Sequence, residues 1–193
     1  MLAGPPPLTP VPATSFSAAP KASAIVVMGV CGSGKSTVAS ALADALQLRM
    51  LDGDDLHEPL SVDKMRSGIP LEDADRLPWL DRVGSYLAAV DEQSPRGRIV
   101  ACSALKRAYR DRIRRICPAV CFVFLDGEPE LIRQRMAQRV GHYMHTGLLA
   151  SQLQALERPQ ADEADVISLD IRLPLPRLVA LSISGLGASP ATG

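Results

Sequence analysis

The chain has 193 residues, of which 47% are hydrophobic, and its 21 basic and 21 acidic side chains give a net charge of zero. This length predicts one domain with a sizeable core, and the balanced charge does not imply a broad basic surface for nucleic acid or anionic lipid. No apolar run approaches the roughly 18 residues of a membrane span, so we expect neither a nucleic-acid nor a membrane partner. The four cysteines fit a reduced, cytoplasmic protein.

The two ends of the chain differ in composition from its middle. Residues 1–22 are rich in proline and alanine, which predicts a disordered extension without helix or sheet. Residues 185–193 consist mostly of small side chains and are expected to form a flexible tail. The folded domain is therefore predicted over residues 23–184.

A phosphate-binding motif follows the first predicted strand. Residues 24–28 form a short β-branched apolar run typical of a buried strand, and residues 37–48 have the apolar spacing of a helix. In such a motif, backbone N–H groups and the helix N-terminus face a phosphate. The motif predicts that the chain binds a nucleoside triphosphate, with Lys35 at the β- and γ-phosphates and Ser36 as a ligand of Mg²⁺. The nucleotide-binding residues are Gly29, Val30, Cys31, Gly32, Ser33, Gly34, Lys35, Ser36 and Thr37, of which the first eight complete the pattern G-x-x-x-x-G-K-[ST].

The remaining elements alternate between strands and helices. Strands are predicted at 49–51, 98–102, 120–125 and 166–169, and helices at 61–67, 78–93, 106–115, 128–139 and 148–156. The segment after residue 169 has no clear pattern and is interrupted by Pro174 and Pro176. This order predicts an α/β fold, in which helices cover both faces of a five-stranded parallel sheet and ligands bind beyond the carboxyl ends of the strands.

Phosphate loops occur in several classes of enzyme. A GTPase would need an N-K-x-D guanine-binding motif, and this chain contains no asparagine. A motor ATPase would hold Mg²⁺ with an acid at the end of a long apolar strand, a position that Asp126 occupies. We interpret Asp126 instead as a strand-end residue that caps the next helix. Asp52 and Asp54 are better candidates for chemistry, because they end the strand that follows the phosphate-loop helix.

Several further motifs together resemble those of the short, bacterial-type gluconokinases. They include the phosphate loop, Asp52-Gly53-Asp54-Asp55-Leu56-His57, Lys64-Met65, Asp75-Arg76-Leu77-Pro78-Trp79-Leu80, Ala101-Cys102-Ser103-Ala104-Leu105-Lys106-Arg107, Tyr109-Arg110-Asp111, Gly141-His142-Tyr143-Met144, Ser151-Gln152 and Leu156-Glu157-Arg158-Pro159. The chain departs from the family pattern at Cys31, where serine is common, and just after His57 and Met144. The resemblance implies a P-loop kinase fold with a mobile lid, related to shikimate and adenylate kinases.

The resemblance also implies a reaction, the transfer of the γ-phosphoryl group of ATP to the 6-hydroxyl group of D-gluconate. Phosphoryl transfer depends on alignment and charge neutralisation. Lys35 would neutralise the developing charge while Ser36 ligates Mg²⁺. Asp54 would orient the attacking hydroxyl and accept its proton, and Asp52 would hold a water on the metal. The roles of the two aspartates could be exchanged, and both could instead cap a helix.

Gluconate is a polyol with a carboxylate, so its pocket needs cations and several hydrogen-bonding groups. Two of the candidates, Lys64 and Lys106, could instead be surface charges, and a third, His57, could be a structural histidine. Arg135 and Arg139 share a helix face leading into a lid at about residues 136–147, where they would contact the phosphates; a solvated basic face is the alternative. The resemblance alone places Gln160 beside adenine and suggests a homodimer. The acceptor-site candidates are Asp54, His57, Lys64, Ser103, Lys106 and Arg110.

Other functions are compatible with the sequence. An enzyme of this type could phosphorylate another small hydroxy acid, such as shikimate, or a nucleoside monophosphate. A non-catalytic nucleotide-binding regulatory module belongs to a different class. The intact Lys35, Ser36 and Asp54 favour catalysis over such a module.

Overall fold

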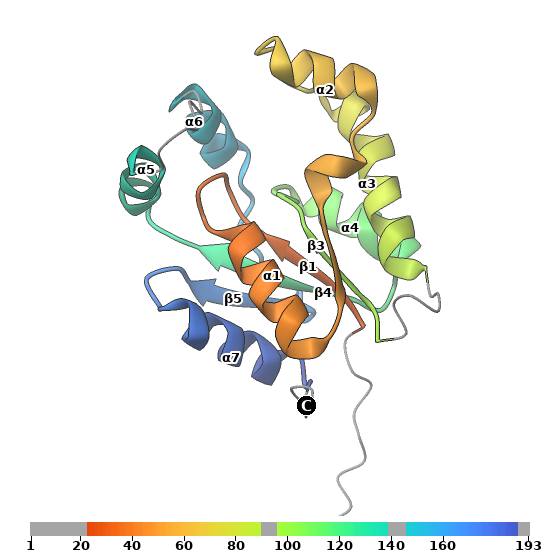
Figure 1. The fold of residues 1–193 in the computed structure, drawn as a ribbon. Helices are drawn as coiled ribbons and strands as arrows, with labels where there is room; N and C mark the ends of the chain where they lie inside the picture. Colours follow the sequence, from red (N-terminus) through yellow and green to blue (C-terminus); the bar gives the residue numbers. More distant parts are fainter. Residues whose placement is uncertain (1–22, 90–95, 139–145, 189–193) are drawn as a thin grey trace, which may run out of the picture.

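Five parallel strands form the centre of the molecule. The computed structural model of the chain describes residues 23–89, 96–138 and 146–188. The strands are β1 (Ala24–Met28), β2 (Arg49–Asp52), β3 (Arg98–Ala101), β4 (Val120–Asp126) and β5 (Val166–Asp170), in the spatial order β2-β3-β1-β4-β5. The predicted five-stranded parallel sheet is therefore confirmed (Figure 1).

Helices cover both faces of this sheet, as predicted. One face carries α1 (Lys35–Leu46) and α7 (Leu175–Gly185), and the other carries α3 (Asp73–Ala88) and α4 (Arg107–Ile116). Near the carboxyl ends of the strands, α2 (Pro59–Arg66) stands on the side of α3, whereas α5 (Pro129–Ala137) and α6 (Thr146–Ala155) stand on the other side (Figure 1). The short 3₁₀ helix η1 (Gly53–Leu56) follows β2. None of the described helices is long and apolar enough to cross a bilayer.

The central strand β1 separates two hydrophobic cores. Ile25 and Val27 pack into the core beneath α1 and α7, whereas Val26 and Met28 pack into the core beneath α3 and α4. This alternation follows from the opposite directions of successive side chains in a strand. Every residue of β1 is at most 3% exposed. The phosphate loop therefore starts at a strand that is buried on both faces.

Helix α3 begins earlier than predicted. Its first residue is Asp73, so Pro78 lies inside the helix and not in its first turn. The Asp75 carboxylate accepts a hydrogen bond from the Glu72 N–H at 2.9 Å, which stabilises the start of the helix. This contact offsets part of the cost of the backbone hydrogen bond that Pro78 cannot donate.

The segment after residue 169, in which the sequence shows no clear pattern, contains helix α7. Pro174 is its N-cap residue and Pro176 lies in its first turn, where backbone N–H groups have no partner within the helix. The two prolines therefore open the helix and do not interrupt it. Leu186, which the sequence placed in the flexible tail, is buried at 7% exposure.

Candidate active site

The phosphate loop joins β1 to α1 through backbone conformations that glycine adopts readily. Gly34, the N-cap residue of α1, has a φ of 98° in the left-handed region. Gly32 has a φ of 78°, and a Cβ atom there would lie 2.5 Å from Met136 Cγ in α5. Helix α1 therefore starts at Lys35, ahead of the predicted Thr37, and its first N–H groups are available to a phosphate.

The Lys35 ammonium contacts the first part of this loop. Its Nζ donates a hydrogen bond to the Val30 carbonyl oxygen at 3.1 Å. Burial lowers the pKa of Lys35 from its ordinary value. An ammonium group has three donors, so the carbonyl leaves two N–H groups for phosphate oxygens. The buried Ser33 hydroxyl, which has no hydrogen-bond partner among the described residues, adds a donor, and the loop thus fits the phosphates of a nucleotide.

The two residues predicted to bind Mg²⁺ are in direct contact. Ser36 Oγ donates a hydrogen bond to Asp52 Oδ2 at 2.9 Å. Asp52 Oδ1 accepts the Asp54 N–H at 3.2 Å and so caps η1, while Oδ2 contacts Ser36, so the cap and a place at the metal site are compatible. Hydroxyl and carboxylate oxygens fit Mg²⁺, which at nucleotide sites takes few protein ligands and completes its shell with phosphates and water. Among the described residues, no group of three His, Cys, Asp or Glu side chains could hold a metal ion.

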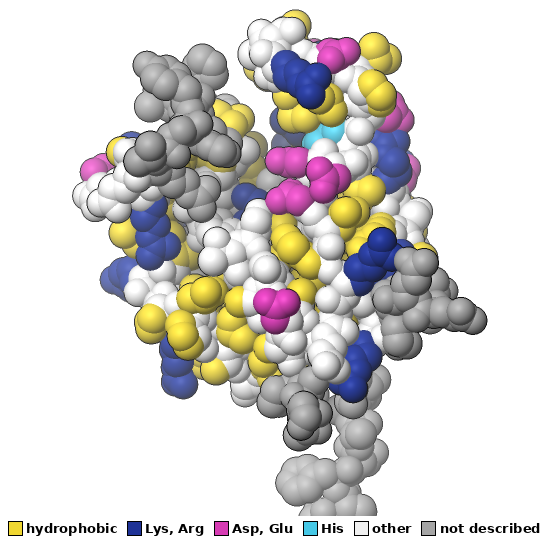
Figure 2. All heavy atoms as spheres, in the orientation of Figure 1, with side chains coloured by type: hydrophobic (Ala, Val, Ile, Leu, Met, Phe, Trp, Pro, Cys, Tyr) yellow, Lys and Arg dark blue, Asp and Glu magenta, His cyan; other side chains and the backbone are white. Residues whose placement is uncertain are grey.

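Asp54 lies in η1, at the carboxyl end of β2. Partial desolvation raises the pKa of its carboxyl group, the charge of Asp52 raises it further, and Lys35 opposes the rise. A raised pKa suits a carboxylate that accepts a proton near neutral pH. A Cβ atom at Gly53 would lie 2.7 Å from the Ala101 carbonyl oxygen, so glycine allows η1 to approach β3. In Figure 2, acidic side chains gather beside the histidine, at a hollow between the α2–α3 and α5–α6 sides.

His57 is neutral and stacks on Trp79. The ring centroids are 4.4 Å apart with an interplanar angle of 11°. Trp79, which is buried as core packing, donates its indole N–H to the Gly53 carbonyl oxygen at 2.6 Å. Burial, together with the positive charge of Arg82, lowers the pKa of His57 to about 4. At neutral pH this residue therefore offers a hydrogen-bonding group without charge, and the stacked pair supports η1.

Both candidate lysines are paired with acids in the first turn of α3. Lys64 Nζ lies 2.6 Å from Asp75 Oδ1. Lys106 Nζ donates to both carboxylate oxygens of Asp73 at 2.9 Å, and the Tyr109 hydroxyl donates to the same carboxylate. Neither lysine is therefore a free cation. A substrate carboxylate would have to replace an aspartate as the partner of a lysine.

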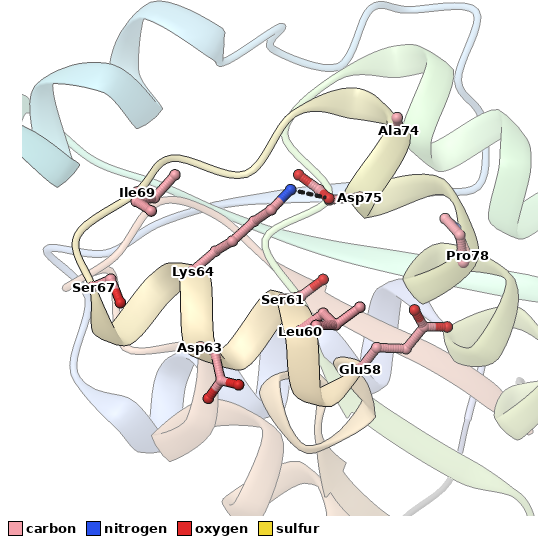
Figure 3. Close-up of a pocket in the computed structure, with 10 residues that line it drawn as sticks. All are labelled: Glu58, Leu60, Ser61, Asp63, Lys64, Ser67, Ile69, Ala74, Asp75 and Pro78. Carbon is pink, nitrogen blue, oxygen red and sulfur yellow. Dashed lines mark hydrogen bonds and ion pairs between the residues drawn. The ribbon is translucent and has the colours of Figure 1, made fainter.

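A cavity of about 410 Å³ lies between α2 and the start of α3. Lys64 and Asp75 point toward each other inside it (Figure 3). The described residues that line the cavity include neither Asp54 nor a residue of the phosphate loop. The cavity is therefore separate from the cluster of Lys35, Ser36 and the two aspartates.

Arg110 does not belong to the acceptor site, contrary to the prediction. Its side chain is 1% exposed and donates from Nε and Nη2 to the two carboxylate oxygens of Glu163, each at 2.7 Å. Its Nη1 donates to the carbonyl oxygens of Ala104, Leu105 and Glu157. The basic helix α4 thus turns one arginine inward, where it joins α4 to the loop before β5. Because it is buried and paired with Glu163, this guanidinium is not accessible to a substrate.

This buried ion pair leads to a prediction about stability. Glu163→Gln should lower the free energy of unfolding by about 3 kcal/mol, because it leaves a buried guanidinium without its anion. Asp162→Asn is the control, since Asp162 is 60% exposed in its pair with Arg107, and should change stability by less than about 0.5 kcal/mol. Urea unfolding of both variants measures the difference, and equal stabilities would contradict the role of the pair.

The pH dependence of the wild type provides a second measurement. Hydrogen bonds from Arg110 hold the pKa of Glu163 at about 2, below its ordinary value of 4.5. A lowered carboxyl pKa contributes stability above the unfolded-state value, and this contribution is lost as the pH falls from 4.5 toward 2. Glu163→Gln should lack this part of the acid sensitivity.

The structure also gives the contacts of Ser103, Gln160 and Asp126. The Ser103 carbonyl oxygen accepts the Gly29 N–H at 3.4 Å, so Ser103 lies next to the start of the phosphate loop. The Gln160 side chain donates to the Arg158 carbonyl oxygen at 2.8 Å, within its own loop. The Arg158 side chain pairs with Asp126 at 3.2 Å. The prediction that Asp126 caps the next helix was wrong, because a different residue is the N-cap of α5.

The predicted lid is only partly described. Arg135, in the last turn of α5, donates to the Ile171 carbonyl oxygen at 2.8 Å, just beyond β5. Arg139 and most of the predicted lid lie outside the described residues.

A contact between α6 and the phosphate loop was also not predicted. The Cys31 N–H in the phosphate loop donates to Gln152 Oε1 in α6 at 2.6 Å, across 121 positions of the chain. Gln152 belongs to the family motif Ser151-Gln152, but its residue type alone indicates no role. No local spacing signals a contact between residues so far apart.

Comparison with known proteins identifies the family. A family model described as an AAA domain matches residues 25–159. The thermosensitive gluconokinase of Escherichia coli is 49% identical over 146 residues, which cover 76% of this chain and 78% of that protein. The chain belongs to the gluconokinase family. The thermoresistant gluconokinase of the same organism is 43% identical over 158 residues, which cover 82% of this chain and 90% of that protein.

A solved structure supports the family assignment. The crystal structure of a gluconokinase from Sinorhizobium meliloti 1021 is 44% identical and superposes with a TM-score of 0.77, covering 86% of this chain and 92% of the other. The family and the P-loop kinase fold predicted from sequence motifs are thus confirmed.

Proposed function

We propose that this protein transfers the γ-phosphoryl group of ATP to the 6-hydroxyl group of D-gluconate, with Mg²⁺ as a second cofactor. The observation that carries the proposal is the contact between Ser36 and Asp52 beside Lys35 and Asp54. Groups suited to phosphate, metal and an attacking hydroxyl thus gather at the carboxyl ends of β1 and β2. Membership of the gluconokinase family supports gluconate as the acceptor.

Each group at this site has a distinct task. The backbone N–H groups of the phosphate loop and the Lys35 ammonium hold the β- and γ-phosphates and neutralise their charge. Ser36 and Asp52 would hold Mg²⁺, which when bound neutralises further phosphate charge. Asp54 accepts a hydrogen bond from the acceptor hydroxyl, aligns it and takes its proton. Arg135 and Arg139 are proposed to reach the phosphates from the lid side.

The acceptor binds beside η1, between the starts of α3 and α4. Ser103 and neutral His57 supply hydrogen bonds to its hydroxyl groups, while Lys64 and Lys106 are the cations for its carboxylate. Binding then replaces a pair between lysine and aspartate by a pair between lysine and substrate. Such an exchange favours an acceptor that carries both a carboxylate and hydroxyl groups.

A comparison of acceptors tests the proposal. The full-length protein is given MgATP with gluconate, shikimate or AMP, and ADP formation is followed with a coupled enzyme while ³¹P spectra identify the product. We expect gluconate-dependent turnover in the range of about 1–100 s⁻¹ that is usual for kinases, and only background rates with the other two acceptors. Preferred phosphorylation of shikimate or AMP would refute gluconate as the substrate. ADP formation independent of every acceptor would favour a nucleotide-binding module.

A further inference from the structure

One peptide unit of the phosphate loop is held at both of its polar ends. The carbonyl oxygen of the Val30–Cys31 peptide accepts a hydrogen bond from Lys35 Nζ at 3.1 Å. The N–H of the same peptide donates to Gln152 Oε1 at 2.6 Å. In a planar trans peptide these two groups point in opposite directions, so Lys35 and Gln152 contact opposite edges of one plane.

The two hydrogen bonds depend on each other. Because the peptide is rigid, a rotation that turns the N–H away from Gln152 also turns the carbonyl away from Lys35. A backbone N–H can only donate, so the glutamine must present its oxygen to this position. Gln152 therefore determines the orientation of the carbonyl that holds the lysine.

Gln152 lies on a helix that packs against the hydrophobic core. Leu149 lies one turn earlier on the same face of α6 and is 3% exposed in the hydrophobic core. On its other side the loop packs against α5, where Met136 Sδ lies 4.0 Å from Cys31 Sγ. The contact with Met136 comes from the Cys31 thiol, which is a weak donor, and does not involve the N–H or the carbonyl of the peptide. The hydrogen bond to Gln152 is made by the peptide N–H itself and therefore restricts rotation of the peptide.

We infer that Gln152 is a positioning residue for Lys35, which it controls through the Val30–Cys31 peptide. With one donor on the Val30 carbonyl, the ammonium keeps two donors for the phosphates and is already ordered when the nucleotide binds. Without Gln152, nucleotide binding must order a long, flexible side chain. The inference rests on the proposed role of Lys35 in binding ATP but not on the identity of the acceptor.

A double-mutant cycle tests this inference without an acceptor. The dissociation constant of a non-hydrolysable ATP analogue with Mg²⁺ is measured by calorimetry for the full-length wild type, Gln152→Met, Lys35→Met and the double variant. We expect Gln152→Met to weaken binding about tenfold in the presence of Lys35, and by less than about twofold in the Lys35→Met background. Gln154→Met, an exposed position on the same helix, is the control and should stay within about twofold of wild type.

The cycle also defines the results that would overturn the inference. An equal weakening in both backgrounds would show that Gln152 acts independently of Lys35. Unchanged or tighter binding by Gln152→Met would show that the contact does not prepare the loop for nucleotide. Thermal melting of each variant excludes unfolding as the cause, and gluconate phosphorylation by the wild type tests the proposed acceptor separately.

A spectroscopic measurement keeps the inference testable if the affinities are too weak to compare. Labelling valine with ¹³C at the carbonyl and cysteine with ¹⁵N selects two Val–Cys pairs, Val30–Cys31 and Val120–Cys121. We expect Gln152→Met and Lys35→Met to shift the Val30 carbonyl resonance in the same direction, and their combination to add little. The Val120 resonance, from β4, is the internal control. A Val30 resonance unaffected by Gln152→Met would overturn the inference.

Discussion

Lys35→Ala is expected to lower the rate of phosphoryl transfer by about 100-fold or more while the protein stays folded. A positioned donor that stabilises the charge of the transition state in a shielded site accelerates a reaction by a factor of this size. Removing the charge should not destabilise the fold, because burial lowers the pKa of Lys35 and the folded state therefore disfavours the charged form. Steady-state rates with saturating MgATP and gluconate, together with a thermal melt, measure both effects.

Arg133→Ala is a matched control for this change. Arg133 is also a cation, but its side chain is 57% exposed in a pair with Glu130. Its removal should leave the rate within about twofold of wild type. A Lys35→Ala enzyme that keeps more than a tenth of the wild-type rate would contradict the assigned role.

Asp54→Asn is expected to lower kcat by about 100-fold or more with little change in ATP affinity. The amide keeps the shape of the side chain but loses the proton acceptor, and general base catalysis contributes about 10² to 10⁴. Because the proposed interaction of Asp54 is with the acceptor hydroxyl, the loss should appear in kcat and not in nucleotide binding. Steady-state rates measure kcat, and the dissociation constant of a MgATP analogue measures nucleotide affinity.

The neighbouring acid provides the control for Asp54. Asp55→Asn removes the same charge from the same 3₁₀ helix, so a purely electrostatic contribution to the site would be lost in both variants. We expect Asp55→Asn to keep most of the activity. If Asp54→Asn weakens MgATP binding and spares kcat, Asp54 serves the metal or the structure and is not the base.

Much of the fold could be predicted because its signals are local. The apolar run of β1 and the glycine spacing before Lys35 lie within a few residues of each other, and alternating strands and helices determine a parallel sheet. The prolines were harder to interpret, because their effect depends on where a helix begins. Pro78 is tolerated within α3, and Pro176 coincides with the first turn of α7.

The side-chain partners could not be predicted, because they come from distant parts of the chain. Arg110 and Glu163 are 53 positions apart, and nothing in a basic amphipathic helix indicates which arginine turns inward. Lys106 reaches Asp73 across 33 positions. The composition identified the lysines as candidates, but only their contacts with Asp75 and Asp73 at the start of α3 show that their charges are already neutralised.

The burial of β1 has a consequence for how nucleotide binding affects the whole domain. A loop attached to a surface strand can unfold locally, and a ligand bound to it then protects only that region. Here the loop continues from strand β1, which contributes side chains to both cores. The start of the loop therefore cannot unfold unless β1 also leaves the sheet. The free energy of nucleotide binding is therefore added to the global stability of the domain. Substitutions deep in either core can in turn alter nucleotide affinity without touching the site.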